Sequence, residues 1–431
     1  LGYRVLGSHI LIYRKKNGEG TAVRPPQETL ARDSIRQIVV RGHVYDRITR
    51  AVIPFATIGI VEENIGTITN SDGIFTLKLP ASLSGTSLVV SHLGYMNQRI
   101  PVQLLNEQRV DIYLDRRVIS IQEVIIRYID PNMVLEKAMD RRKNNYAPEP
   151  VYLTAFYREG VQKNDKYVCY SEAVFKVYKT PFDAGVNSDQ VKLRKSRKVQ
   201  NSDPIDTVYL KLKAGVQSAL RLDIVKCIPD FLDLRPPSGY AYGYSGIVSY
   251  HDRDAYAIRF EPDNGDDRAL YTGTLFIDKD NYAILGADFE ISPSCLEKAA
   301  DDLILRKSLK LVVRLEKISY AVSYASSNGR YYLNHVRCDI RLKTRLRHHL
   351  SPDHFSTFLE LATCRIDTAN VVKFPRQETL KTQVIFSDQP FSPGDDFWGA
   401  NNIITPEAKL TEALSGIMGK IEDAPDPVKE H

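Results

Sequence analysis

The stretch that decides the fold begins with IVVRGHVYD at residues 38–46, continues with TIGIVEENIGTITNSDGIFTLKLP at residues 57–80 and ends with RVDIYL at residues 109–114. Apolar and polar residues alternate within it, as they do in half-buried strands, for example through Phe75, Thr76 and Leu77. The segment NSDG at residues 70–73 predicts a tight hairpin in which Gly73 takes a positive φ. This pattern predicts a small β-sandwich that carries no catalytic group.

A set of residues spread over this stretch resembles the carboxypeptidase regulatory-like domain, a seven-stranded β-sandwich. The matching residues are Gly42, Asp46, Pro54, Ala56, Thr57, Gly66, Thr67, Thr69, Asn70, Asp72, Gly73, Phe75, Ser91, Gly94 and Tyr95. Proline cannot donate to a β-ladder, so we expect Pro54 at a strand start or a bulge. The domain is the non-catalytic appendage of carboxypeptidases, so the resemblance implies no peptidase. In Gram-negative envelopes it often precedes TonB-dependent transporters.

The first residues also follow a strand pattern, LGYRV at residues 1–5 and SHILIY at residues 8–13. This hairpin resembles the end of a secretin and TonB N-terminus domain. The resemblance predicts that residues 1–16 are the remnant of such a domain. It also predicts that the full-length protein has a signal peptide, which is absent from this sequence. A native N-terminal hairpin is the alternative. Residues 17–36 are polar with two Gly and two Pro, which is typical of a linker.

Composition limits the class of protein. The chain has 431 residues, of which 43% are hydrophobic and 26% are charged, values that exclude a wholly disordered protein. A formal charge of +5 is too small to indicate a nucleic-acid partner. Five scattered cysteines indicate neither a disulfide framework nor a zinc site. No run of about twenty apolar residues is present, so we expect no transmembrane helix.

The rest of the chain predicts a larger, mainly β domain. We expect the sandwich at residues 37–115, a connector at 116–130, a helix plus a curved antiparallel sheet at 131–390, and a C-terminal segment with a short helix at 391–431. A helix is predicted from Pro131 to Tyr146, and another one from Thr405 as the N-cap and Pro406. The lone Trp398 is expected to anchor the C-terminal segment.

Long alternating strands follow residue 151. The apolar positions shift phase by one residue between residues 309–315 and 318–324, which predicts a β-bulge near Glu316 and Lys317. Long bulged strands favour a strongly curved sheet, which is either a half-barrel wrapped around a helix or a barrel. Residues 246–260 and 271–278 resemble the periplasmic lipoprotein-carrier fold, in which a strand that ends in Ile-Asp introduces a turn.

A search for catalytic patterns finds none of the metalloprotease, nucleophile-elbow, phosphate-loop or dinucleotide motifs. Ser245 is expected to be a loop residue. The pairs Asp266-Asp267 and Asp301-Asp302 are expected in polar turns, where adjacent side chains diverge. His348, His349 and His354 form the one histidine cluster, and solvated loop residues are favoured over metal ligands there.

Tyr240, Tyr242, Tyr244 and Tyr250 are the candidate binding residues. Tyrosines two apart on a strand share a face, which can stack on sugar rings or line an apolar groove. Ordinary sheet packing is the alternative in a chain with 24 tyrosines.

The sequence therefore predicts a non-enzymatic cell-envelope protein, periplasmic or associated with the outer membrane, without cofactor or metal. Its partners would be an envelope protein, a glycan or a lipid-like ligand. Because the chain does not continue into a plug and a barrel after residue 126, transport through its own pore is not expected. The alternatives are an envelope glycan hydrolase with an unrecognised site and a lipid or lipoprotein carrier.

Overall fold

The computed structural model describes residues 2–6, 9–13, 37–105, 109–117, 129–185, 187–200, 211–212, 215–235, 239–250, 253–263, 271–306, 311–346, 351–380, 397–407 and 410. The chain divides into two compact units, residues 1–36 and 37–431. In the first unit β1 (Gly2–Leu6) and β2 (His9–Tyr13) pair antiparallel, so the predicted N-terminal hairpin is present. The predicted linker at residues 17–36 lies outside the described residues.

The second unit begins with a seven-stranded sandwich. Its strands are β3 (Gln37–Asp46), β4 (Thr57–Ile60), β5 (Ile65–Ile68), β6 (Ile74–Pro80), β7 (Ser87–Ser91), β8 (Gln98–Pro101) and β9 (Arg109–Leu114). One layer has the order β6-β3-β9, in which β3 and β9 are parallel, and the other has the order β5-β4-β7-β8. The alternating apolar residues meet between the layers, where Phe75, Leu77 and Val44 are fully buried.

The turn at residues 70–73 differs from the prediction in one respect. Gly73 does take a positive φ of 72°. The prediction of a tight hairpin is wrong, because β5 pairs with β4 whereas β6 pairs with β3, so the turn carries the chain from one layer to the other. The Asn70 side chain fixes this crossing by accepting hydrogen bonds from the backbone N–H groups of Asp72 and Ile74 at 3.0 and 2.9 Å.

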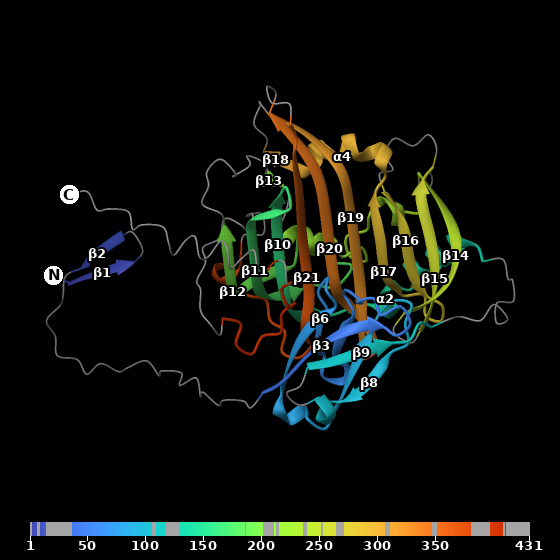
Figure 1. The fold of residues 1–431 in the computed structure, drawn as a ribbon, viewed down its shortest axis with the longest axis horizontal. Coiled ribbons are helices and arrows are strands. Elements are labelled where there is room, and N and C mark those ends of the chain that lie inside the picture. The colour runs from blue at the N-terminus through green and yellow to red at the C-terminus, as the bar shows by residue number, and fades with distance from the viewer. Residues whose placement is uncertain are drawn as a thin grey trace. The chain divides into compact units, whose positions relative to one another are not determined.

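Ten long antiparallel strands form the curved sheet, in the order β14-β15-β16-β17-β19-β20-β21-β10-β11-β12 (Figure 1). They are β10 (Val151–Lys163), β11 (Lys166–Lys179), β12 (Gln190–Gln200), β14 (Tyr240–Tyr250), β15 (Arg253–Pro262), β16 (Tyr271–Asp278), β17 (Ile284–Ile291), β19 (Leu311–Ser327), β20 (Arg330–Leu346) and β21 (Asp353–Asp367). A small separate pair consists of β13 (Lys211–Leu212) and β18 (Ile304–Arg306). The predicted fold class is confirmed, and so is the bulge, since the register shifts between Leu315 and Lys317.

Short helices cover one face of this sheet, which we call the helix-covered face. They are α1 (Pro131–Asp140), α2 (Arg142–Asn145), α3 (Val216–Arg221) and α4 (Leu296–Leu303). Val134, Leu135 and Ala138 of α1 are buried in the main core together with the inward residues of the strands. The predicted helix over residues 131–146 is therefore present but interrupted at Arg141. None of the described helices is long and apolar enough to span a membrane.

Two other local predictions are corrected. Asp301 and Asp302 belong to α4 rather than to a turn. Thr405 and Pro406 are not helical, and most of the helix predicted after them lies outside the described residues. Trp398 is buried, with its ring edge-on to Phe156 at 5.5 Å, which agrees with the predicted anchor.

The opposite face of the sheet, which we call the sandwich face, carries a continuous row of paired residues across nine strands. Consecutive Cα partners from β15 to β12 are Arg259, Thr274, Asp288, Ala321, Arg337, Glu360, Arg158, Glu172 and Arg197. We call this set the transverse row. Because cross-strand partners project from the same face, it brings residues distant in sequence within reach of one another.

The half of the transverse row around Arg158 is buried. Arg158 and Glu360 have no exposed surface, and the Arg158 Nε donates to Glu360 Oε2 at 2.6 Å. The two terminal nitrogens of Arg158 donate to Glu407 at 2.8 and 3.0 Å, so the guanidinium is held by two carboxylates. Glu407 lies in residues 397–407, the described part of the C-terminal segment, which contacts both the sheet and the sandwich. Thr67 and Asn70 of the sandwich donate to its backbone carbonyl groups.

Replacing Glu360 with Gln should destabilise the protein strongly. The substitution keeps the shape of the side chain but removes the fully buried carboxylate that Arg158 and Arg337 share, which leaves Glu407 beside Arg158 and Asp339 beside Arg337. Breaking a buried ion pair typically costs about 3–5 kcal/mol. Denaturant unfolding of the full chain measures the loss. Asp367→Asn is the matched control on the same strand, because its partner Arg365 is 56% exposed and such pairs contribute about 1 kcal/mol or less. Equal losses in the two variants would contradict this role.

Stability should also fall in acid because of Glu360. Burial alone would raise the pKa of this carboxyl, but the guanidinium groups of Arg158 and Arg337 hold the pKa well below its ordinary value of 4.5. A carboxyl with a lowered pKa stabilises the fold at pH values above the ordinary pKa, and this contribution is lost as the pH falls below it. Unfolding curves measured from neutral pH downward should fall more steeply below about pH 4.5 for the wild type than for Glu360→Gln. Parallel curves would refute the assignment.

Candidate functional site

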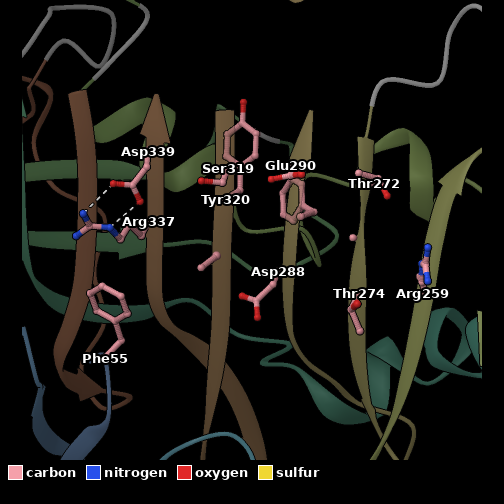
Figure 2. Close-up of a pocket in the computed structure, with 13 residues that line it drawn as sticks. Phe55, Arg259, Thr272, Thr274, Asp288, Glu290, Ser319, Tyr320, Arg337 and Asp339 are labelled. Atoms are coloured by element: carbon pink, nitrogen blue, oxygen red, sulfur yellow. Dashed lines mark hydrogen bonds and ion pairs between the residues drawn. The ribbon is translucent and has the colours of Figure 1, made fainter. Parts of the chain in front are cut away.

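The other half of the transverse row lies in an open groove on the sandwich face (Figure 2). The groove has a volume of about 470 Å³, within the range of small-molecule sites. Its lining residues come from β15, β16, β17, β19, β20 and the sandwich: Phe55, Arg259, Thr272, Gly273, Thr274, Asp288, Phe289, Glu290, Ser319, Tyr320, Ala321, Arg337 and Asp339. A ligand here would therefore contact both parts of the second unit.

The floor of the groove holds polar groups that the protein leaves unused. Among the described residues, none forms a hydrogen bond or ion pair with the Asp288 carboxylate, or a hydrogen bond with the Thr274 and Ser319 hydroxyls. Asp288 is exposed to solvent, yet the surrounding walls displace enough water to raise the pKa of this carboxyl above its ordinary value. Ala321 is the next residue in the row, and its small side chain leaves the space beside Asp288 empty.

The charged groups in the wall of the groove are paired. Arg337 donates through Nε and Nη2 to both oxygens of Asp339 at 2.8 Å, and its Nη1 lies 3.4 Å from Glu360. Arg337 thus joins the open half of the row to the buried half. Its guanidinium also lies over the rings of Phe358 and Phe55, at 4.9 and 5.2 Å from their centroids, which are favourable cation–π distances.

Phe55 is the residue of the sandwich that lines the groove, and its backbone is strained. Its φ of 58° is rare for a bulky residue and costs on the order of 1–3 kcal/mol. The buried Thr69 holds this turn, because its hydroxyl donates to the Ile53 carbonyl and accepts from the Ala56 N–H, both at 2.8 Å. The Phe55 ring stacks on His335 of β20 at 5.3 Å. The turn therefore presents one aromatic side chain to the curved sheet.

The four predicted tyrosines lie on edge strand β14, but not on one face. Ser245 is the extra residue of a β-bulge between Tyr244 and Gly246, so its predicted loop position is wrong. Because a bulge shifts the alternation by one residue, Tyr250 lies on the opposite face from Tyr240, Tyr242 and Tyr244.

The surroundings of these tyrosines are aromatic and mostly buried. Tyr240 is 6% exposed and packs edge-on to Phe231, and the Tyr242 hydroxyl donates to the Phe231 carbonyl at 3.1 Å. Tyr250 is 6% exposed as well, while Tyr242 and Tyr244 are half-buried beside the main core. Their role in ligand binding stays a prediction, and none of the four lines the groove.

The other chemical candidates are dispersed. His354 lies near Glu316, with 3.9 Å between Nδ1 and Oε2, while His348 and His349 lie outside the described residues, as do Asp266 and Asp267. Within the described ranges, no group of three or more His, Cys, Asp or Glu side chains is placed to hold a metal ion.

The groove is not predictable from local patterns, because its residues come from six segments of the chain. A usable signal was present, however. Thr272, Thr274, Asp288, Glu290, Ser319 and Ala321 occupy alternate strand positions, so these strands have a polar or small face beside an apolar one. A sheet with one such face must leave it in solvent or cover it with another polar surface.

One protein family matches part of the chain. Residues 40–126 match the CarboxypepD_reg-like domain family, which confirms the resemblance inferred from the sandwich sequence. The matched residues run from within β3 to beyond β9 and contain Phe55. The match does not extend to the curved sheet. No curated protein matches the chain.

Solved structures give distant matches. They include an outer membrane lipoprotein-sorting protein domain from Vibrio parahaemolyticus (11% identity, 57% of this chain and 95% of that one, TM-score 0.25). A LolA superfamily protein from Nitrosomonas europaea has 13% identity over 59% of this chain and 100% of its own, with a TM-score of 0.22. A DUF1329 family protein from Desulfovibrio piger has 12% identity over 57% and 96%, with a TM-score of 0.26. TM-scores this low support no transfer of function.

Replacing Asp288 with Asn should leave stability at neutral pH unchanged or slightly higher. A carboxyl whose pKa is raised in the folded state begins to oppose folding when the pH exceeds its ordinary pKa, and does so fully above the raised pKa. Among the described residues, Asp288 forms no ion pair that the substitution would break. Thermal unfolding at about pH 7 measures the effect. A marked loss of stability, like that expected for Glu360→Gln, would mean that Asp288 has a structural role.

Proposed function

We propose that this chain is a non-enzymatic binding protein of the Gram-negative cell envelope, with the groove on the sandwich face as its ligand site. The observation that carries the proposal is the unused Asp288 carboxylate beside two unused hydroxyls, in a groove of about 470 Å³. Polar groups without protein partners are costly unless solvent or a ligand pairs with them. The chemistry of the floor favours a polar ligand.

The envelope location rests on the sandwich. Its family, the carboxypeptidase regulatory-like domain, is a non-catalytic module, and its frequent place ahead of envelope transporters supports a role as an adaptor. In this chain the sandwich would fix the wall of the groove through Phe55. A protein partner in the envelope stays a prediction.

Carriage of a lipid-like molecule is the second candidate, favoured by the half-barrel sheet with helices on one face. It would use the helix-covered face. There, a cavity of about 40 Å³ lies between Tyr146, Lys179 and Tyr324, which is room for one or two water molecules. Acyl chains would need α1 and α3 to move outward. Native mass spectrometry of the purified full chain separates the two candidates, because a carrier would retain lipid.

Ala321→Leu should abolish binding of polar ligands without unfolding the protein. The larger side chain would fill the space beside Asp288, and a β-strand position on an open face tolerates leucine. A screen of the full chain against a panel of oligosaccharides, followed by calorimetric titration of any ligand found, measures binding.

Arg341→Leu is the matched control. Arg341 of β20 is exposed on the sandwich face, the face on which Ala321 of β19 also lies, but Arg341 lies outside the groove. It should bind like the wild type. A ligand that binds Ala321→Leu as well as it binds the wild type would overturn the proposal, as would a wild type that binds no polar ligand.

A further inference from the structure

The charges of the groove do not balance. Glu290 accepts from Lys317 Nζ at 2.8 Å, Asp339 is paired with Arg337, and Arg259 lies 3.5 Å from Glu261. Each of these pairs is neutral overall. Asp288 is the remaining charge. The nearby His335, which is bonded to Glu360, interacts with it electrostatically, but among the described residues none forms an ion pair with it, so the floor of the groove carries one negative charge without an ion-pair partner. A ligand that supplies one positive charge at this point would complete the pairing.

The neighbours of Asp288 are hydroxyl groups. Thr274 is the cross-strand partner of Asp288 on β16, and Ser319 on β19 is diagonal to it, because Ser319 pairs with Glu290 and Ala321 pairs with Asp288. Such positions lie about 5 Å apart for direct pairs and about 7–8 Å apart for diagonal pairs. One pyranose ring with its substituents spans this distance.

The backbone of the floor cannot recognise a peptide by adding a strand. The groove lies over the middle of the sheet, where β16 and β17 each pair with a strand on both sides, so their N–H and C=O groups are already used. Recognition must come from side chains. The floor offers hydroxyl groups, which donate and accept hydrogen bonds, and a carboxylate, which accepts them, and this set suits a ligand with many hydroxyl groups.

We propose that the ligand is an oligosaccharide containing an amino sugar, with its ammonium group on Asp288 and its ring hydroxyls on Thr274 and Ser319. This inference rests on the proposed function and names its ligand class. The Phe55 ring at the sandwich end adds an apolar surface on which the face of a sugar ring can lie. The Phe55 ring already lies against the Arg337 guanidinium, so Asp288 is the group that would select the ammonium.

Three tetrasaccharides with the same β-1,4 linkage test the inference. They differ only at C2, which carries a hydroxyl in cellotetraose, an acetamide in the chitin tetramer and an ammonium in the chitosan tetramer. Titration of the full chain at about pH 6, where the amine is protonated, should show the chitosan tetramer binding about fivefold to tenfold more tightly than cellotetraose. This preference should weaken as NaCl is raised, since the charge pair is open to solvent.

Asp288→Asn should lower the affinity for the chitosan tetramer to about its affinity for cellotetraose, so that the preference is lost, and Asp288→Glu should retain part of the preference. A preference that is absent from the wild type, or that persists in Asp288→Asn, would overturn the inference. Trilysine is the control for charge alone, and trilysine that binds as tightly as the chitosan tetramer would overturn the saccharide assignment.

The same titrations separate this inference from the proposed function. If all three tetrasaccharides bind equally and Ala321→Leu abolishes their binding, the ammonium assignment fails and the binding groove stands. If none of them binds, and no other polar ligand distinguishes Ala321→Leu from the wild type, both fail.

Discussion

The structure depends on the neutralisation of Arg158. A guanidinium without exposed surface is tolerated only where carboxylates surround it, because desolvation of an unpaired charge costs several kcal/mol. Glu360 supplies one carboxylate from the adjacent strand. Glu407 supplies the other from 249 residues further along the chain. The C-terminal segment must therefore return to the sheet before this region can be buried.

The return of the C-terminal segment also explains how the sandwich is held. Residues 402–405 exchange hydrogen bonds with Thr67, Asn70 and Lys78 of the sandwich, while Ile404 and Trp398 pack with Phe156 of the sheet. One extended segment thus contacts both parts of the second unit. Around Arg158 the transverse row is closed and paired, whereas around Asp288 it is open and unpaired. The same cross-strand geometry therefore buries paired charges in one half and exposes polar side chains to the groove in the other.

Sequence patterns predicted the elements that depend on neighbouring residues. The sandwich strands, the start of α1 at Pro131 and the bulge beside Glu316 follow from alternation, capping and phase. The prediction failed where partners are distant. The turn at residues 70–73 was predicted as a hairpin because the residues of the turn itself do not determine which layer of the sandwich the next strand joins. The groove was missed because Asp288, Ala321 and Arg337 become neighbours only through strand pairing, and the bulge at Ser245 separates tyrosines that simple alternation had grouped.

Phe55 connects the sandwich to the wall of the groove. A phenylalanine with a positive φ is strained, and such strain persists only where the surrounding contacts fix the turn. Thr69 fixes it from inside the sandwich, and His335 and Arg337 fix the ring from the curved sheet. Any shift of the sandwich against the sheet would therefore move Phe55 and loosen Arg337, which forms the groove wall. The position of the sandwich is thereby coupled to the geometry of the groove wall.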